Sequence, residues 1–182
     1  MRVVQLKATR FSSPIGELTL IGRRGALYRV DLPQTEPEMR MDWLRTYVAE
    51  SATLSWDDEA FRGWKARFHR YFSGRSESFT GTIDLRGSSF QVDVLRALME
   101  VPYGHTISYG ALAARAGHSG ATQAVGQAVH ANPLAIVVPC HRVIGADGNL
   151  VGYAAGLDSK RYLLTIEDAL KQGDLFAASS KR

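Results

Sequence analysis

The pattern of the sequence changes near Arg86-Gly87. Upstream, short runs of strand-forming residues alternate with turn signals, whereas downstream apolar residues recur at helical spacing among many small residues. The chain has 182 residues, which is enough for one large domain or two small ones. We therefore predict an α+β fold, in which an N-terminal α/β domain with an antiparallel sheet occupies residues 1–85. A mainly helical C-terminal domain would occupy residues 86–182.

Strand candidates come first along the chain. Residues 18–21 and 26–30 are short and rich in strand formers. The Gly-Arg-Arg-Gly run at 22–25 predicts a hairpin connection between them, and the Ser-Pro-Ile-Gly run at 13–16 predicts a turn. A further strand is predicted over residues 79–85.

An amphipathic helix is predicted over residues 57–73. Aromatic residues recur there at helical spacing, acidic residues begin the segment, and Gly74 can end it. We assign the aromatic stripe to core packing, because an apolar stripe on a helix usually faces the core. Residues 32–56 are polar and mixed, and they give no clear pattern.

Two short helices in the C-terminal part have the spacing of a helix-turn-helix. Ser108 is a suitable N-cap for a helix over residues 109–116, and residues 121–130 form the second helix. The spacing alone is weak support for DNA binding, because many helical corners share it. The flanking helices are predicted over residues 89–99, capped by Ser88 or Ser89, and over residues 159–170, before a polar, frayed tail.

The composition excludes several classes of protein. A single cysteine, Cys140, rules out an internal disulfide and cysteine-rich zinc sites, and the five histidines are scattered, so we expect no metal and no cofactor. The longest apolar run, residues 134–138, is far too short to span a membrane. The N-terminus lacks the apolar stretch of a signal peptide, which predicts a cytoplasmic protein with no membrane partner.

The charge and the second short helix bear on nucleic-acid binding. The formal net charge is +4, spread over both halves, which favours a nucleic-acid partner only mildly. The helix over residues 121–130 is unusually rich in Ala and Gly, so it could approach another surface closely, either the protein's own sheet or DNA. It offers only Gln123, Gln127 and His130 for contacts with base edges, so any DNA recognition would depend mainly on shape.

Cys140 is the candidate nucleophile. We predict that residues 134–138 form a buried strand that leads through Pro139 to the cysteine. A thiolate is favoured by a nearby positive charge, which His141 and Arg142 can supply. Neighbouring side chains on an extended chain point apart, so we expect a water to bridge Cys140 and His141. The alternative is a buried, inert cysteine.

The residues around the cysteine resemble those of a known family. Pro139-Cys140-His141-Arg142-Val143 looks like the active-site motif of the O6-alkylguanine-DNA alkyltransferases, also called methylated-DNA–protein-cysteine methyltransferases. The resemblance covers most of the chain. Its other motifs, in order, are Ser13-Pro14-Ile15-Gly16, Tyr71-Phe72-Ser73-Gly74, Phe90-Gln91, Val101-Pro102-Tyr103-Gly104, Ser108-Tyr109-Gly110, Ala124-Val125-Gly126, Asn132-Pro133 and Gly152-Tyr153.

The resemblance implies a DNA repair protein that acts once. Cys140 would take the alkyl group from O6 of a guanine flipped out of the duplex, and would stay alkylated. His141 would deprotonate Cys140 through a water, and Glu167 would orient His141. Tyr109 would contact the phosphate of the flipped nucleotide and donate a proton to guanine N3. Asn132 would hold the loop that joins the second short helix to the cysteine.

The resemblance also implies binding of double-stranded DNA containing O6-alkylguanine, with the helix pair in the minor groove and the protein a monomer. The residues implied at the DNA are Tyr109, Thr122, Gln123, Ala124, Gln127 and Arg142. Those implied in the substrate pocket are Val143, Tyr153, Ala154 and Ala155. Some relatives carry zinc in the N-terminal half through cysteines, but this sequence has no cysteine there, so we expect no metal and no cofactor.

Two positions depart from the family pattern. Gln123 stands where the family usually has an arginine that fills the gap left by the flipped base, so we expect slower extrusion and slower repair, unless Arg115 or His130 compensates. Ala154 and Ala155 stand where relatives often carry Ser or Gly. Because Ala155 is small, we expect tolerance of groups larger than methyl.

Three other functions stay open at this point. An alkylation-damage sensor would bind lesions with little transfer, but relatives of that kind replace the cysteine. An alkylation-responsive transcription regulator would show sequence-specific binding. A cysteine hydrolase would turn over repeatedly, whereas an alkyl acceptor stops after one event per molecule.

Overall fold

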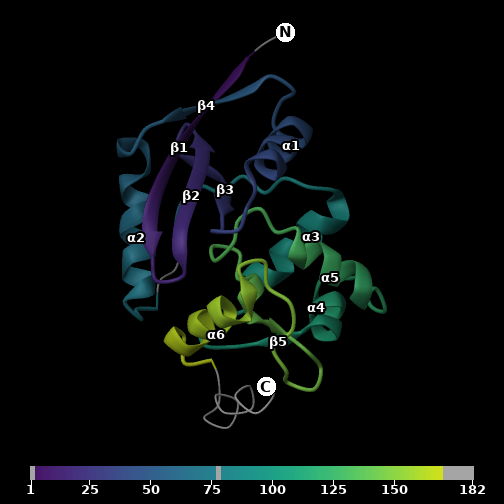
Figure 1. The fold of residues 1–182 in the computed structure, drawn as a ribbon. Coiled ribbons are helices and arrows are strands. Elements are labelled where there is room, and N and C mark those ends of the chain that lie inside the picture. The colour runs from purple at the N-terminus through teal and green to yellow at the C-terminus, as the bar shows by residue number, and fades with distance from the viewer. Residues whose placement is uncertain (1–2, 77–78, 170–182) are drawn as a thin grey trace.

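The N-terminal half is built on a four-stranded mixed sheet (Figure 1). The computed structural model describes residues 3–76 and 79–169. Strands β1 (Val4–Ser13), β2 (Gly16–Arg23) and β3 (Ala26–Asp31) form an antiparallel meander, and β4 (Ala52–Trp56) pairs with β1 in parallel. The strand order is β3-β2-β1-β4, so the predicted antiparallel sheet carries one parallel edge strand.

The hairpin between β2 and β3 forms where the sequence predicted it. Its two central residues, Arg24 and Gly25, have φ of 51° and 82°. Positive φ at both positions is the conformation of a type I′ turn, which matches the twist of antiparallel strands. The turn fixes the register of β2 against β3.

The two faces of the sheet are covered by different helices. Helix α2 (Arg62–Phe72), preceded by the 3₁₀ turn η1 (Glu59–Phe61), packs on one face against Leu18 and Leu20. Helix α1 (Pro37–Tyr47) covers the other face. Side chains of a strand alternate between faces, which is why Leu20 and Ile21 belong to different cores.

The C-terminal half is mainly helical. Its helices are α3 (Ser89–Met99), α4 (Tyr109–Arg115), α5 (Thr122–His130) and α6 (Gly156–Ile166), with the 3₁₀ turn η2 (Cys140–Arg142). Strands β5 (Ile107–Ser108) and β6 (Val143–Ile144) form a short parallel ladder. Ser88 and Ser108 cap α3 and α4 by accepting from backbone N–H groups at 3.2 Å, as predicted.

One hydrophobic core crosses from the sheet into the helices. Buried residues of β2, β3 and α2 belong to the same cluster as those of α3, α5 and the segment before Cys140. The Val30 N–H of β3 also donates to the Pro133 carbonyl at 2.8 Å, across the two halves. Residues before and after the predicted boundary at 85 and 86 therefore pack together in one hydrophobic core.

Several local predictions differ from the structure. Residues 79–85 make only an isolated bridge, between Leu27 and Ile83, instead of a strand. Residues 32–56, which gave no pattern, contain α1 and β4. The last helix begins at Gly156 and ends at Ile166, and the predicted end at Leu170 and the tail lie outside the described residues. No helix within residues 3–76 and 79–169 is long and apolar enough to cross a membrane.

Candidate active site

Cys140 follows a buried tight turn, where a strand was predicted. The Val138 N–H donates to the Leu134 carbonyl at 2.8 Å, and the Val137 N–H donates to the Ala135 carbonyl at 2.9 Å. Ile136, at the tip, has a φ of 71°, which is rare for a β-branched residue and costs about 1–3 kcal/mol. The prediction of a strand was wrong because an apolar run signals burial without fixing the backbone conformation.

Asn132 ties this turn together. Its Nδ2 donates to the Val138 carbonyl at 2.8 Å, and its Oδ1 accepts from the Leu134 N–H at 2.9 Å. One side chain thus bonds both ends of the turn, which stabilises the strained conformation. This geometry agrees with the holding role that the resemblance implied.

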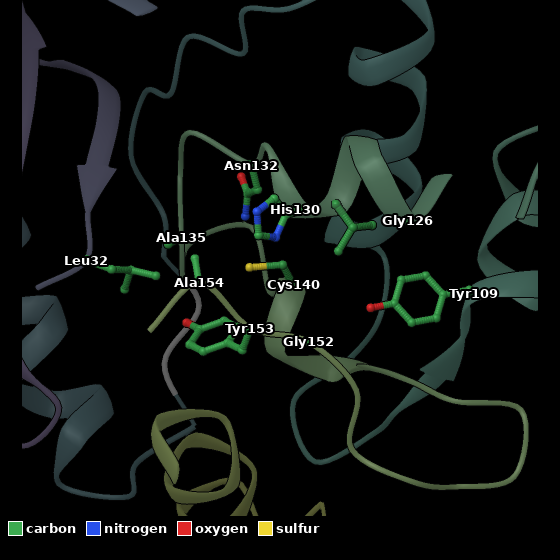
Figure 2. Close-up of a pocket in the computed structure, with 11 residues that line it drawn as sticks. Leu32, Tyr109, Gly126, His130, Asn132, Ala135, Cys140, Gly152, Tyr153 and Ala154 are labelled. Atoms are coloured by element: carbon green, nitrogen blue, oxygen red, sulfur yellow. The ribbon is translucent and has the colours of Figure 1, made fainter. Parts of the chain in front are cut away.

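The Cys140 side chain lines a cavity of about 210 Å³, whose lining comes from the C-terminal half and from Leu32 (Figure 2). The thiol is buried, and burial raises its pKa. The Asn132 side chain and the positive charge of Lys160 oppose this rise. Both groups favour the thiolate, the nucleophilic form.

His141 and Glu167 form a fully enclosed pair. His141 Nε2 lies 2.7 Å from Glu167 Oε1, and Glu167 is placed there by the end of α6. Burial alone would raise the pKa of Glu167, but hydrogen bonds from His141 and Arg142 outweigh it and lower the pKa to about 2. An ionised carboxylate only accepts, so Nε2 carries the proton of a neutral imidazole.

The other ring nitrogen of His141 is ready to accept a proton. Burial lowers the pKa of His141, against the opposing effect of Glu167, so the ring is neutral at pH 7. Its Nδ1 is buried and has no partner among the described residues. An unpaired buried acceptor in the ring next to a cysteine is what a general base requires.

Arg142 points into the protein, and the prediction that it contacts DNA does not agree with this structure. Its guanidinium donates to Glu167 Oε2 from Nε at 2.8 Å and to the Val101 carbonyl at 2.6 Å. The side chain is buried, so its charge compensates Glu167. The physical reason is that the 3₁₀ turn of residues 140–142 rotates successive side chains to different sides, whereas an extended strand would alternate them.

Two tyrosines face the cavity. Tyr109, at the start of α4, lies across from Cys140 with its hydroxyl directed into the cavity (Figure 2). Burial, and secondarily the charge of Cys140, raises the pKa of Tyr109. The Tyr153 hydroxyl is buried without a partner among the described residues, and burial raises its pKa well above the ordinary value. Both tyrosines therefore keep their protons at neutral pH and can act as donors.

Of the other three residues predicted in the substrate pocket, one lines the cavity and two do not. Ala154 lines the cavity as expected, whereas Val143 and Ala155 are buried but do not line it. The Val143 carbonyl instead accepts from Lys160 Nζ at 2.6 Å.

Lys160 is a buried cation that the sequence reasoning missed. Its Nζ also donates to the carbonyls of Val151 and Gly152, at 2.6 and 3.2 Å. Burial lowers its pKa to about 8. These bonds fix the loop that leads to Tyr153. Spacing gave no signal for Lys160, because a lysine in an amphipathic helix is ordinarily exposed.

Helix α5 joins an exposed face to the cavity. The side chains of Thr122, Gln123, Ala124 and Gln127 are all exposed. On the same helix, Gly126 and His130 line the cavity. A ligand spread over the exposed face would therefore lie next to the opening towards Cys140.

A second cavity of about 180 Å³ adjoins the first. The two share Leu32, His130, Asn132, Ala135 and Ala154, and the second extends to Met39 and Trp43 of α1. Two of these five shared residues, Ala135 and Ala154, have only a methyl side chain, so they leave more room where the cavities meet than a larger side chain would. Within residues 3–76 and 79–169, no three His, Cys, Asp or Glu side chains gather where they could hold a metal ion.

Comparison with known proteins agrees with this site. Residues 89–169 match the family model for the 6-O-methylguanine DNA methyltransferase, DNA binding domain. The methylated-DNA–protein-cysteine methyltransferase of Mycobacterium tuberculosis strain H37Rv is 43% identical over 164 residues, which cover 90% of this chain and 93% of the relative. The enzyme of the same name from Methanosarcina acetivorans is 40% identical over 159 residues, or 86% of this chain and 95% of the relative.

Solved structures give the same result. The crystal structure of Mycobacterium tuberculosis OGT in complex with DNA is 39% identical, with a TM-score of 0.78 over 93% of this chain and 97% of that chain. The structure of O6-methylguanine-DNA methyltransferase from Pyrococcus kodakaraensis is 26% identical, with a TM-score of 0.65 over 89% and 98%. The sequence identity, its coverage and the shared fold together show that this chain belongs to the methylated-DNA–protein-cysteine methyltransferase family.

Proposed function

We propose that the protein repairs DNA by accepting the alkyl group of O6-alkylguanine on Cys140, and that each molecule acts once. The observation that carries the proposal is the cavity-lining cysteine beside a histidine with a fixed tautomer. Glu167 holds the Nε2–H of His141, which leaves the Nδ1 lone pair free. Membership of the family supports the same reaction.

The transfer would begin with removal of the thiol proton. A water would take the proton from Cys140 and pass it to Nδ1 of His141, because that nitrogen is buried and has no partner within the described part of the chain. The imidazolium that forms is stabilised by the ionised Glu167 at 2.7 Å. Arg142 keeps that carboxylate ionised and fixed.

The thiolate would then attack the alkyl carbon. An S–C bond forms, the O6–C bond breaks, and its electron pair stays with the guanine. Tyr109 would donate a proton to guanine N3, so that the base leaves neutral. The imidazolium later loses its proton and Tyr109 regains one through solvent, which closes the proton count. The thioether is stable, and this ends the activity of the molecule.

The lesion must leave the duplex to reach Cys140, because the reacting carbon of a stacked base is inaccessible. The exposed residues Thr122, Gln123, Ala124 and Gln127 would contact the DNA, and the flipped base would enter beside Gly126. Gln123 would occupy the gap left by the base. It carries no charge and is shorter than arginine, so we expect slow extrusion. We propose that the protein acts as a monomer in the cytoplasm.

The stoichiometry of transfer tests this proposal. The protein is incubated with a tenfold excess of a duplex containing one O6-methylguanine, and the restored guanine is measured by chromatography of the hydrolysed DNA. We expect a rise to one guanine per protein molecule and then no more, and none with the Cys140→Ser variant. Continued restoration of guanine beyond one per protein molecule would identify a hydrolase. Binding of the lesion without restoration of guanine would identify a sensor.

A further inference from the structure

The hydroxyl of Tyr71 lies beside the His141–Glu167 pair and contacts both residues. Tyr71 is fully buried near the end of α2, in the N-terminal half. Its OH donates to Glu167 Oε1 at 2.6 Å and lies 3.2 Å from His141 Nε2. These partners follow Tyr71 by 96 and 70 residues in the sequence, so the contact exists only because the two halves pack together.

Packing accounts for the ring of Tyr71 but not for its hydroxyl. The ring contacts Phe72, Phe79 and Tyr103, and a phenylalanine could make the same contacts. A buried hydroxyl is costly unless it is hydrogen-bonded, and this one bonds the carboxylate oxygen that also holds His141. The aromatic stripe of α2, assigned to the core from its spacing, thus also contributes a polar group to the site.

Tyr71 completes the set of donors to Glu167. Oε1 accepts from Tyr71, from His141 and from Arg142 Nη2 at 3.0 Å, and Oε2 accepts from Arg142 Nε. Burial, and then the negative charge of Glu167, raises the pKa of Tyr71 well above its ordinary value. Tyr71 therefore remains protonated and donates to Glu167, and this hydrogen bond helps to hold the carboxylate in one orientation.

We propose that Tyr71 is a positioning residue for alkyl transfer, through which the N-terminal half fixes Glu167 and so sets the basicity and tautomer of His141. The inference rests on the proposed function of Cys140. The groups that act on His141 are Glu167 and Tyr71, together with the more distant charges of Arg142 and Lys160.

Loss of the hydroxyl has a defined electrostatic consequence. Without the Tyr71 donor, Glu167 accepts more strongly from His141 Nε2, and this raises the pKa of His141 at Nδ1. The acid limb of the pH–rate profile for transfer should then move to higher pH. A residue that only filled space would change stability or the overall rate and would leave the midpoint of that limb unchanged.

The test compares Tyr71→Phe with Tyr103→Phe. Tyr103 is a matched control, because its ring packs edge-on against Tyr71 while its hydroxyl donates to the Ile166 carbonyl and leaves Glu167 untouched. Single-turnover transfer from a duplex containing O6-methylguanine is measured from pH 5 to 9. We expect Tyr71→Phe to slow transfer about tenfold, since it loses a hydrogen bond to a charged group, and to raise the acid midpoint. Tyr103→Phe should keep the wild-type midpoint.

Three results would overturn the inference. The first is a wild-type rate and midpoint in Tyr71→Phe, and the second is an equal loss of rate in both variants with no shift of midpoint. The third is the absence, in proton NMR spectra of the wild-type protein, of a slowly exchanging Tyr71 hydroxyl proton close to the His141 ring. This measurement does not depend on the folding of a variant. If the wild-type protein itself transferred nothing, the proposed function would fail first, which separates the two failures.

Discussion

Replacing Glu167 by Gln should remove a large part of the acid sensitivity of folding. The pKa of Glu167 is about 2 in the folded protein, against an ordinary value of 4.5. Because the folded pKa is depressed, the stabilisation is complete above pH 4.5 and is lost as the pH falls towards 2. The difference corresponds to about 3 kcal/mol at neutral pH, of which about 2 kcal/mol is lost by pH 3.

The measurement is urea-induced unfolding of the wild-type protein and of Glu167→Gln at several pH values from 7 to 3. Other carboxylates titrate in both proteins, so the difference between the two free energies of unfolding isolates Glu167. At pH 7 the variant should be about 3–5 kcal/mol less stable, because Arg142 stays buried without its carboxylate. That difference should shrink by about 2 kcal/mol at pH 3.

An exposed carboxylate serves as the control. Glu59 makes an ion pair with Arg62, but its side chain is 73% exposed, so Glu59→Gln should track the wild-type protein at every pH. A difference in the free energy of unfolding between wild type and Glu167→Gln that stays constant from pH 7 to 3 would contradict this prediction. It would mean that Glu167 is not the ionised acceptor of His141.

Three further variants probe the turn, the DNA face and the pocket. Asn132→Ala removes both bonds that hold the Cys140 turn, so transfer should slow at least tenfold and stability should fall by about 1–3 kcal/mol, measured by single-turnover kinetics and thermal unfolding. Gln123→Arg should raise the repair rate, and an unchanged rate would count against slow extrusion. Ala154→Leu narrows the opening between the two cavities, so transfer of a benzyl group should slow more than transfer of a methyl group, and equal slowing would contradict that role for the second cavity.

The sequence predicted those elements whose local signals agree with their tertiary setting. Three predictions of this kind are confirmed: the hairpin connection at residues 22–25, the caps at Ser88 and Ser108, and the short helix pair α4–α5. β4 was missed because a short parallel edge strand depends on its partner β1 rather than on its own pattern. α1 was missed because only Leu44 of this helix is fully buried, so its apolar stripe is weak.

Several residues of the site were named from the sequence, but the contacts of Arg142, Tyr71 and Lys160 were not. The resemblance implied Cys140, His141 and Glu167, but spacing could not show that Arg142 turns inward. Tyr71 and Lys160 reach the site through long-range packing and through backbone carbonyls, and neither leaves a local pattern. Such buried polar contacts are decided by the tertiary fold, which a pattern of apolar residues does not specify.

Acceptance of the alkyl group by Cys140 is the step on which the proposed function depends. Its most direct test is intact-protein and peptide mass spectrometry after incubation with a duplex containing O6-methylguanine, with Cys140→Ser as the control. We expect a single added methyl group, located on Cys140, that saturates at one per molecule and is absent from the control. Transfer of the methyl group to another residue, or an unmodified protein after the lesion has been bound, would contradict it.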